Sequence, residues 1–108
     1  MRRKPMKQYN QTQKTKLASA ARSLSEALLV LQTPSEIKDF LEDLCTPAEI
    51  EAMVDRWRVV QLLVEKKSYR EINQITGVSV TTVGRVARFM EMGAGGYKTA
   101  LQRLDKTT

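Results

Sequence analysis

The chain has 108 residues, the size of one domain, and a formal net charge of +6 at pH 7. It contains no histidine and a single cysteine, Cys45, which excludes a zinc cluster, an internal disulfide and a histidine-based catalytic mechanism. No apolar run approaches the ~20 residues of a membrane span, and no apolar segment follows the basic N-terminus as in a secretory signal. Because Leu, Ala, Glu, Lys and Arg dominate, we expect an all-α cytoplasmic protein that is not an enzyme and has no membrane partner.

Residues 1–14 are expected to form a flexible basic arm. The first sixteen residues carry six basic side chains and no acidic one, and they show no apolar periodicity. Such an arm could lie along DNA phosphates or in a minor groove, and a mobile solubilising tail is the alternative.

A first helix is expected from about Thr15 to Leu31, because apolar residues recur there at alternating steps of four and three. These residues are Leu17, Ala21, Leu24, Leu28 and Leu31. A short bundle could not cover a leucine seam of this length. We therefore expect a second copy of the chain to cover it, in a symmetric homodimer.

Two Thr-Pro-x-Glu sequences predict where the next two helices begin. In each, Thr is the N-cap, Pro takes the first helical position and Glu is the capping-box partner. The first, at residues 33–36, opens a short helix, and the second, at residues 46–49, opens a helix that extends to about Lys66. The apolar side of the longer helix consists of Ile50, Met53, Val54, Trp57, Val60, Leu63 and Val64.

Residues 68–92 have the pattern of a helix-turn-helix. Ser68 caps a first helix with Glu71 as its capping-box partner, and Gly77 ends that helix in a left-handed conformation. Ser79 then caps a second helix that begins at Val80. The apolar positions that let the two helices cross and bury a small core are Ile72, Ile75, Val78, Val80, Val83 and Val86.

The outward face of the second helix suits the major groove of DNA. It combines short hydrogen-bonding groups, a bare backbone position and two guanidinium groups. Its residues are Thr81, Thr82, Gly84, Arg85 and Arg88. A solvated face on an ordinary helical hairpin is the alternative.

The charge distribution favours the same region. Residues 17–65 contain nine acidic and four basic residues, whereas residues 66–103 contain two acidic and seven basic ones. A basic surface confined to a helix-turn-helix is typical of phosphate binding. Beyond the glycines at 93–96, a short last helix is expected from Tyr97 to Leu104, with Ala100, Leu101 and Leu104 inside.

The run from Leu44 to Arg88 resembles the tryptophan-repressor superfamily, and most of all its YerC/YecD repressor-related branch. The shared features are the Thr-Pro-x-Glu helix start, Ser-x-Arg-Glu at the next helix, and Gly before a Thr-rich recognition helix that ends in Arg. The resemblance covers about residues 15–106. It implies a six-helix, intertwined homodimer that binds DNA, usually as a repressor, with tryptophan as corepressor in the founding member.

The resemblance also implies roles for single residues. Arg70 would contact a base edge or a phosphate, and Asn73 would face the groove beside it. Thr82 would contact a phosphate, and the residues that would face bases are Ser79, Val80, Thr81 and Gly84.

Thr46, Arg56 and Arg85 fall where the repressor holds its corepressor. Two arginines could clamp a carboxylate and stack on a flat ring. The other walls depart from the family pattern, with Asp43, Cys45, Val86 and Phe89 at positions where the ligand would be met. These departures argue against tryptophan, so that either another small ligand binds or no corepressor is needed. For Arg56, an ion pair with Asp55, Glu49 or another acid of the helices is the alternative.

The expected function is sequence-specific binding of double-stranded DNA by a homodimeric transcriptional regulator, chiefly a repressor, acting at the nucleoid. Two alternatives stay open. One is a DNA-binding accessory factor for recombination or replication. The other is an antitoxin-like or scaffold module that acts mainly through protein partners, which the acidic residues 17–65 could bind.

Overall fold

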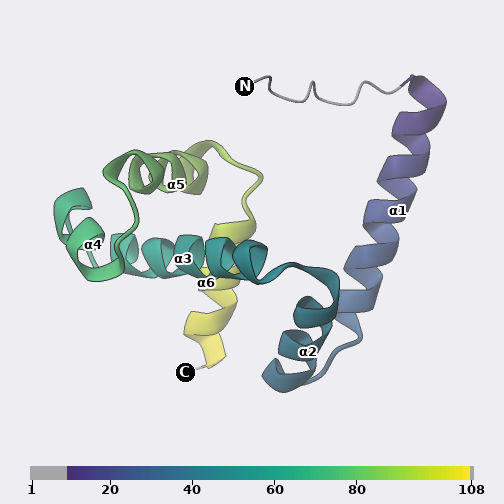
Figure 1. Cartoon of the computed structure of the whole chain (residues 1–108), viewed down its shortest axis with the longest axis horizontal. Helices are drawn as coiled ribbons and strands as arrows, with labels where there is room; N and C mark the ends of the chain where they lie inside the picture. The colour runs from purple at the N-terminus through teal and green to yellow at the C-terminus, as the bar shows by residue number, and fades with distance from the viewer. Residues whose placement is uncertain (1–9, 108) are drawn as a thin grey trace. The chain divides into compact units, whose positions relative to one another are not determined.

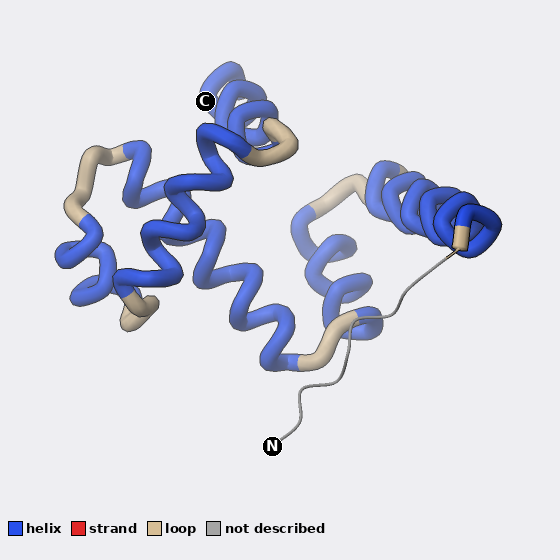
Figure 2. The backbone as a smooth tube through the Cα atoms, turned by 90° about the horizontal axis from the view of Figure 1, so that it is seen from above, coloured by secondary structure: helices blue, strands red, loops and turns tan. Residues whose placement is uncertain are grey.

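The computed structural model describes residues 10–107, and the side chains of residues 10–105. Within this range the chain folds into six helices joined by short loops, with no strand (Figures 1 and 2). The all-α, six-helix prediction is thereby confirmed. Residues 1–9 of the expected basic arm lie outside the described residues.

The chain divides into two compact units, of which the first ends at Leu44 and the second begins at Cys45. The first unit contains α1 (Gln11–Leu29) and α2 (Pro34–Leu44). The second contains α3 (Pro47–Val64), α4 (Tyr69–Thr76), α5 (Val80–Met92) and α6 (Gly96–Thr107).

Helix α1 begins four residues earlier than the apolar pattern predicted, because Asn10 caps it. The Asn10 Oδ1 atom accepts from the Gln13 backbone N–H at 2.8 Å, and the Gln13 Oε1 atom accepts from the Asn10 backbone N–H at 2.8 Å. This reciprocal pair satisfies two of the N–H groups that a helix start leaves unpaired. Residues 11–14 of the expected arm are therefore helical.

The first unit has no buried residue in its described range. Leu17 and Leu24 of the predicted leucine seam are 52% and 40% exposed, and Leu28 is 36% exposed. The described part of α1 thus presents an apolar stripe that its own unit leaves uncovered.

Helix α3 begins as its Thr-Pro-x-Glu sequence predicted. The Thr46 Oγ1 atom accepts from the Glu49 backbone N–H at 3.2 Å, and the Glu49 Oε1 atom accepts from the Thr46 backbone N–H at 2.8 Å. Pro47 occupies the first helical position, where its missing N–H has no intrahelical partner to lose.

This cap makes stability sensitive to acid. The hydrogen bond from the Thr46 backbone N–H, and secondarily the Thr46 side chain, lower the pKa of Glu49 from its ordinary value of 4.5. A carboxyl group with a lowered pKa in the folded state stabilises the fold at pH values above its ordinary pKa, and this stabilisation is lost as the pH falls through the lowered value. We expect Glu49→Gln to flatten the pH dependence of the free energy of unfolding in that acidic range, measured by urea denaturation at successive pH values. Glu51→Gln, at an exposed position of the same helix, is the control, and identical profiles for the two variants would contradict the prediction.

The core lies in the second unit, where α3, α4 and α5 cross (Figure 1). Its fully buried side chains are Val59, Val60, Ile72, Val83 and Val86. Around them pack Trp57, Leu62, Leu63, Val78, Met90, Tyr97 and Leu101. The Trp57 and Tyr97 rings, with centroids 6.3 Å apart, join the start of α6 to α3.

Several apolar residues that were expected inside are exposed instead. Ile75 is 46% exposed and Val80 is 50% exposed, although both belong to the helix-turn-helix pattern. Val54, Val64 and Leu104 are also more than half exposed, whereas Val59, which the pattern did not include, is fully buried. The reason is that three helices crossing around one small core bury only the positions nearest the crossing point.

Across the described residues, no helix is both long enough and apolar enough to pass through a membrane.

Candidate nucleic-acid interface

The turn between α4 and α5 has the backbone that its sequence predicted. Gly77 has a φ of +77° and ends α4, and its N–H donates to the Asn73 carbonyl oxygen at 2.8 Å. Ser79 caps α5 by accepting from the Thr82 N–H at 3.2 Å. Ser68 caps α4 by accepting from the Glu71 N–H at 3.1 Å. Only this half of the predicted capping box at Ser68 is present in the described part of the chain.

Two polar side chains hold the turn at a fixed angle. The Asn73 amide donates to the Val78 carbonyl oxygen at 2.9 Å, across the turn. The Thr76 hydroxyl donates to the Ile72 carbonyl oxygen at 2.7 Å and accepts from the Val78 N–H at 3.0 Å. Asn73, which was expected to face the groove, therefore has its amide engaged within the motif. It positions α5 relative to α4.

The exposed side of α5 carries four of the five residues that were predicted on its outward face, whereas Thr82 is half-buried and lines a different cavity. Thr81, Arg85 and Arg88 are exposed, and Gly84 is half-buried. They line one shallow hollow of about 670 Å³, whose remaining walls are Phe89 and Met92. Phe89 and Met92 were missing from the predicted DNA-binding set, because an apolar residue at the end of a helix gives no signal of that kind.

Tyr69 joins the start of α4 to the middle of α5. A Cβ atom at Gly84 would lie 3.5 Å from the Tyr69 Cε2 atom, which is ordinary van der Waals contact. The ring of Tyr69 thus packs against the bare backbone of α5. Arg70 follows Tyr69 on the same first turn of α4, and its side chain is exposed.

Within the described part of the helix-turn-helix, the basic side chains form no ion pair with acidic neighbours. The ion pairs among the described side chains are Arg22–Glu26 at 3.2 Å and Lys38–Glu42 at 2.7 Å, and both lie in the first unit. The five Lys and Arg residues between 66 and 88, which belong to the helix-turn-helix and the segment before it, therefore have no carboxylate within 4.0 Å in the described structure. An uncompensated positive surface of this kind attracts DNA phosphates.

Arg56 and Arg85, from α3 and α5, line a second cavity. It measures about 350 Å³, and its other walls are Thr82, Val86, Phe89 and Tyr97. Thr46 is not among the lining residues, since it lies ten residues before Arg56 in the chain, about 15 Å along a helix. The alternative for Arg56, an ion pair with Asp55 or Glu49, is absent from the described side chains.

The comparisons with known proteins identify the family. Residues 19–105 match the family described as Trp repressor protein. The chain belongs to this family. YerC, an uncharacterized protein of Bacillus subtilis (strain 168), is 36% identical to it over 84 residues, which cover 78% of this chain and 81% of YerC.

Two crystal structures of Trp repressor-like proteins have the same fold. A TrpR-like protein from Eubacterium eligens ATCC 27750 superposes with a TM-score of 0.78 and 37% identity, covering 84% of this chain and 95% of its own. A candidate Trp repressor from Staphylococcus aureus has a TM-score of 0.77 and 33% identity, covering 86% and 94% of the two chains. Trp repressor proteins form a regulatory, DNA-binding family with a helix-turn-helix.

The cavity of this Trp repressor protein is lined in part by an aromatic side chain of the chain itself. The Arg85 guanidinium carbon lies 6.0 Å from the centroid of the Phe89 ring, so that the chain's own aromatic side chain faces the guanidinium group. Val86, only 2% exposed, belongs to the core and adds two methyl groups to the cavity wall.

Proposed function

We propose that this protein is a sequence-specific transcriptional regulator, a repressor that occludes promoter DNA by placing α5 in the major groove. The observation that carries the proposal is the outward face of α5, where the Thr81 hydroxyl, a glycine and two arginines without a described ion-pair partner share one side of a capped helix. Such a regulator acts on double-stranded DNA at the nucleoid.

The dimensions and chemistry of α5 fit this role. The major groove is about 12 Å wide and admits one α-helix. Ser79, Val80 and Thr81 lie at the N-terminus of α5, the part of a recognition helix that meets base edges. Arg85 and Arg88 follow one and two turns later on the exposed surface, where guanidinium groups can reach guanine edges or phosphates.

The hydroxyl of Thr81 provides the test of direct base reading. We expect Thr81→Ala to weaken binding to the preferred site more than binding to random duplex DNA, because only the preferred site offers the matching base edge. Preferred sites are first selected from genomic fragments at ~0.15 M salt, with and without an amino-acid mixture, and affinities are then measured by titration. Thr99→Ala, on the exposed surface of α6, is the matched control.

Equal losses on both kinds of DNA would count against base reading by Thr81. If the wild-type protein bound all duplexes equally and selected no site, the antitoxin-like or scaffold function would be favoured instead. If the protein bound its preferred site only when one amino acid was present, a small ligand would be assigned to the cavity lined by Arg56 and Arg85.

We further propose that the regulator is a homodimer that buries the leucine seam of α1. Two copies of α5 could then address half-sites one helical turn, ~34 Å, apart on one face of DNA. The support is the exposure of Leu17, Leu24 and Leu28, which lie on one stripe of a helix with no buried residue.

If the leucine stripe forms the dimer interface, a single charged side chain introduced into it should prevent dimer formation. We expect the wild-type chain to elute as a dimer at micromolar concentration, and Leu24→Glu to shift it to monomer, measured by gel filtration with light scattering. Ser19→Glu places the same charge on the opposite side of α1 and should leave the dimer intact. A wild-type monomer would overturn the dimer proposal.

A further inference from the structure

Lys66 has a backbone conformation that a lysine rarely adopts. Its φ is +66°, and within the described range it is the one residue other than glycine with a positive φ. A side chain in this region meets its own backbone, a cost that glycine avoids. The structure nevertheless has a lysine here, directly between the end of α3 and the Ser68 cap of α4.

The hydrogen bonds around Lys66 show why the backbone must turn at this point. The Lys66 N–H donates to the Leu63 carbonyl oxygen at 3.0 Å, and the Lys67 N–H donates to the Leu62 carbonyl oxygen at 3.2 Å. This pair of bonds is the Schellman motif that ends many helices, and glycine is the usual residue at the left-handed position. The motif requires the left-handed conformation but gives no reason for a lysine.

The Schellman hydrogen bonds involve only the backbone, and nothing within the described structure engages the Lys66 side chain. This side chain is exposed and has no carboxylate within 4.0 Å. No hydrogen bond within the described chain involves its ammonium group. Residues held in a sparsely populated backbone conformation cluster at positions that meet a ligand.

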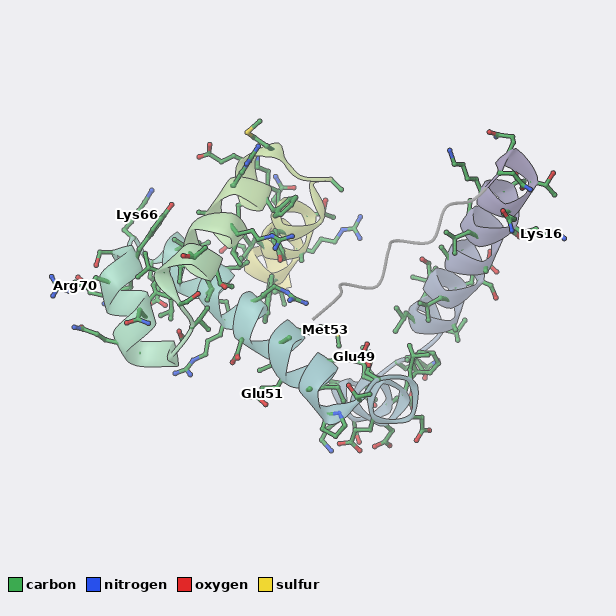
Figure 3. The ribbon with its side chains drawn as sticks, turned by 45° about the horizontal axis from the view of Figure 1, so that its top comes forward. Lys16, Glu49, Glu51, Met53, Lys66 and Arg70 are labelled. Carbon is green, nitrogen blue, oxygen red and sulfur yellow. The ribbon has the colours of Figure 1, made fainter. Side chains whose placement is uncertain are left out.

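The positive charges around Lys66 indicate that its ligand is an anion. Lys67 follows directly, and Arg70 lies on the first turn of α4, so three unpaired cations occupy five residues. The packing of Tyr69 against Gly84 joins the start of α4, which directly follows these lysines, to the middle of α5. Figure 3 shows the labelled side chains of Lys66 and Arg70 projecting outward from the same end of the second unit.

We propose that Lys66, assisted by Lys67, binds a DNA backbone phosphate at the edge of the major groove and thereby fixes the register of α5. This inference rests on the proposed DNA-binding function. Phosphates border the groove that a recognition helix enters, and a lysine acts on them as a flexible point charge. The contact is independent of sequence, because a phosphate is the same at every base pair.

Lys66→Gly relieves the backbone strain and also removes the positive charge. The two changes affect different measurements, thermal stability and DNA affinity. We expect the variant to unfold at a temperature higher by roughly 4 °C or more. It should also bind the preferred and the random duplex more weakly by similar factors. The slope of log affinity against log salt should fall in magnitude by about 0.9 for each chain bound.

Two further variants keep the test independent of folding. Lys66→Arg retains the charge and should retain the wild-type slope. Lys66→Asn removes the charge but keeps a residue that tolerates the left-handed conformation, and it should show the same smaller slope as Lys66→Gly. Lys98→Ala on α6 removes an exposed charge outside the motif and should leave the slope unchanged. A stabilised Lys66→Gly variant with an unchanged slope would overturn this inference and leave the proposed function intact. A wild-type protein that bound no duplex DNA would overturn the proposed function itself.

Discussion

Replacing Ile72 by alanine is expected to lower the free energy of unfolding by about 2–5 kcal/mol. Ile72 is fully buried and is the side chain that α4 contributes to the buried cluster of α3 and α5. Removing three of its carbon atoms leaves a cavity that two short helices can fill only in part. Because domains of this size are stable by about 5–15 kcal/mol, the loss is a large fraction of the total.

The measurement is urea unfolding followed by circular dichroism, at one chain concentration because a dimer's stability depends on it. Ile75→Ala is the control, since it makes the same change in the same helix at a position that is 46% exposed. Its cost should stay below about 1 kcal/mol. Equal costs for the two variants would show that α4 does not pack through Ile72.

Arg70→Ala is expected to weaken binding to the preferred DNA site by about 1–3 kcal/mol, or roughly 5- to 150-fold. Arg70 is exposed on the first turn of α4 and has no carboxylate partner among the described side chains, so its guanidinium group is available to DNA. The neighbouring Tyr69 packs at Gly84 and holds this turn beside α5.

The pattern of the loss distinguishes the two contacts that Arg70 could make. A bidentate contact to guanine predicts a larger loss on the preferred site than on random DNA, together with relaxed selectivity at one base pair. A phosphate contact predicts equal losses and a smaller salt dependence. Arg103→Ala on α6 is the control, and an Arg70→Ala variant that matches it on both kinds of DNA would remove Arg70 from the interface.

Local chemistry made most helix boundaries predictable from the sequence. Thr46, Ser68 and Ser79 cap their helices through hydrogen bonds that span three residues, and Gly77 takes its left-handed conformation within one turn. Interactions this short depend on neighbouring residues alone. The capping box of Asn10 was readable in the same way, but it lies in a basic polar segment without apolar periodicity and was missed.

The interior could be predicted only in part. Periodicity correctly assigned Val60, Ile72, Val83 and Val86 to buried faces, because each faces a neighbouring helix. It could not show which positions lie nearest the crossing point, and so it included Ile75 and omitted Val59. The angle between helices decides this, and that angle results from the packing of all three.

The sequence by itself thus determined six helices, most of their caps and a helix-turn-helix with a basic outward face, since each depends on contacts within a few residues or on simple charge. Only the tertiary structure decided that Asn73 ties the turn to Val78, that Arg56 and Arg85 share a cavity without Thr46, and that Lys66 is left-handed. These features arise where helices meet or where one ends against the next. Such geometry depends on packing between segments, which no single stretch of sequence encodes.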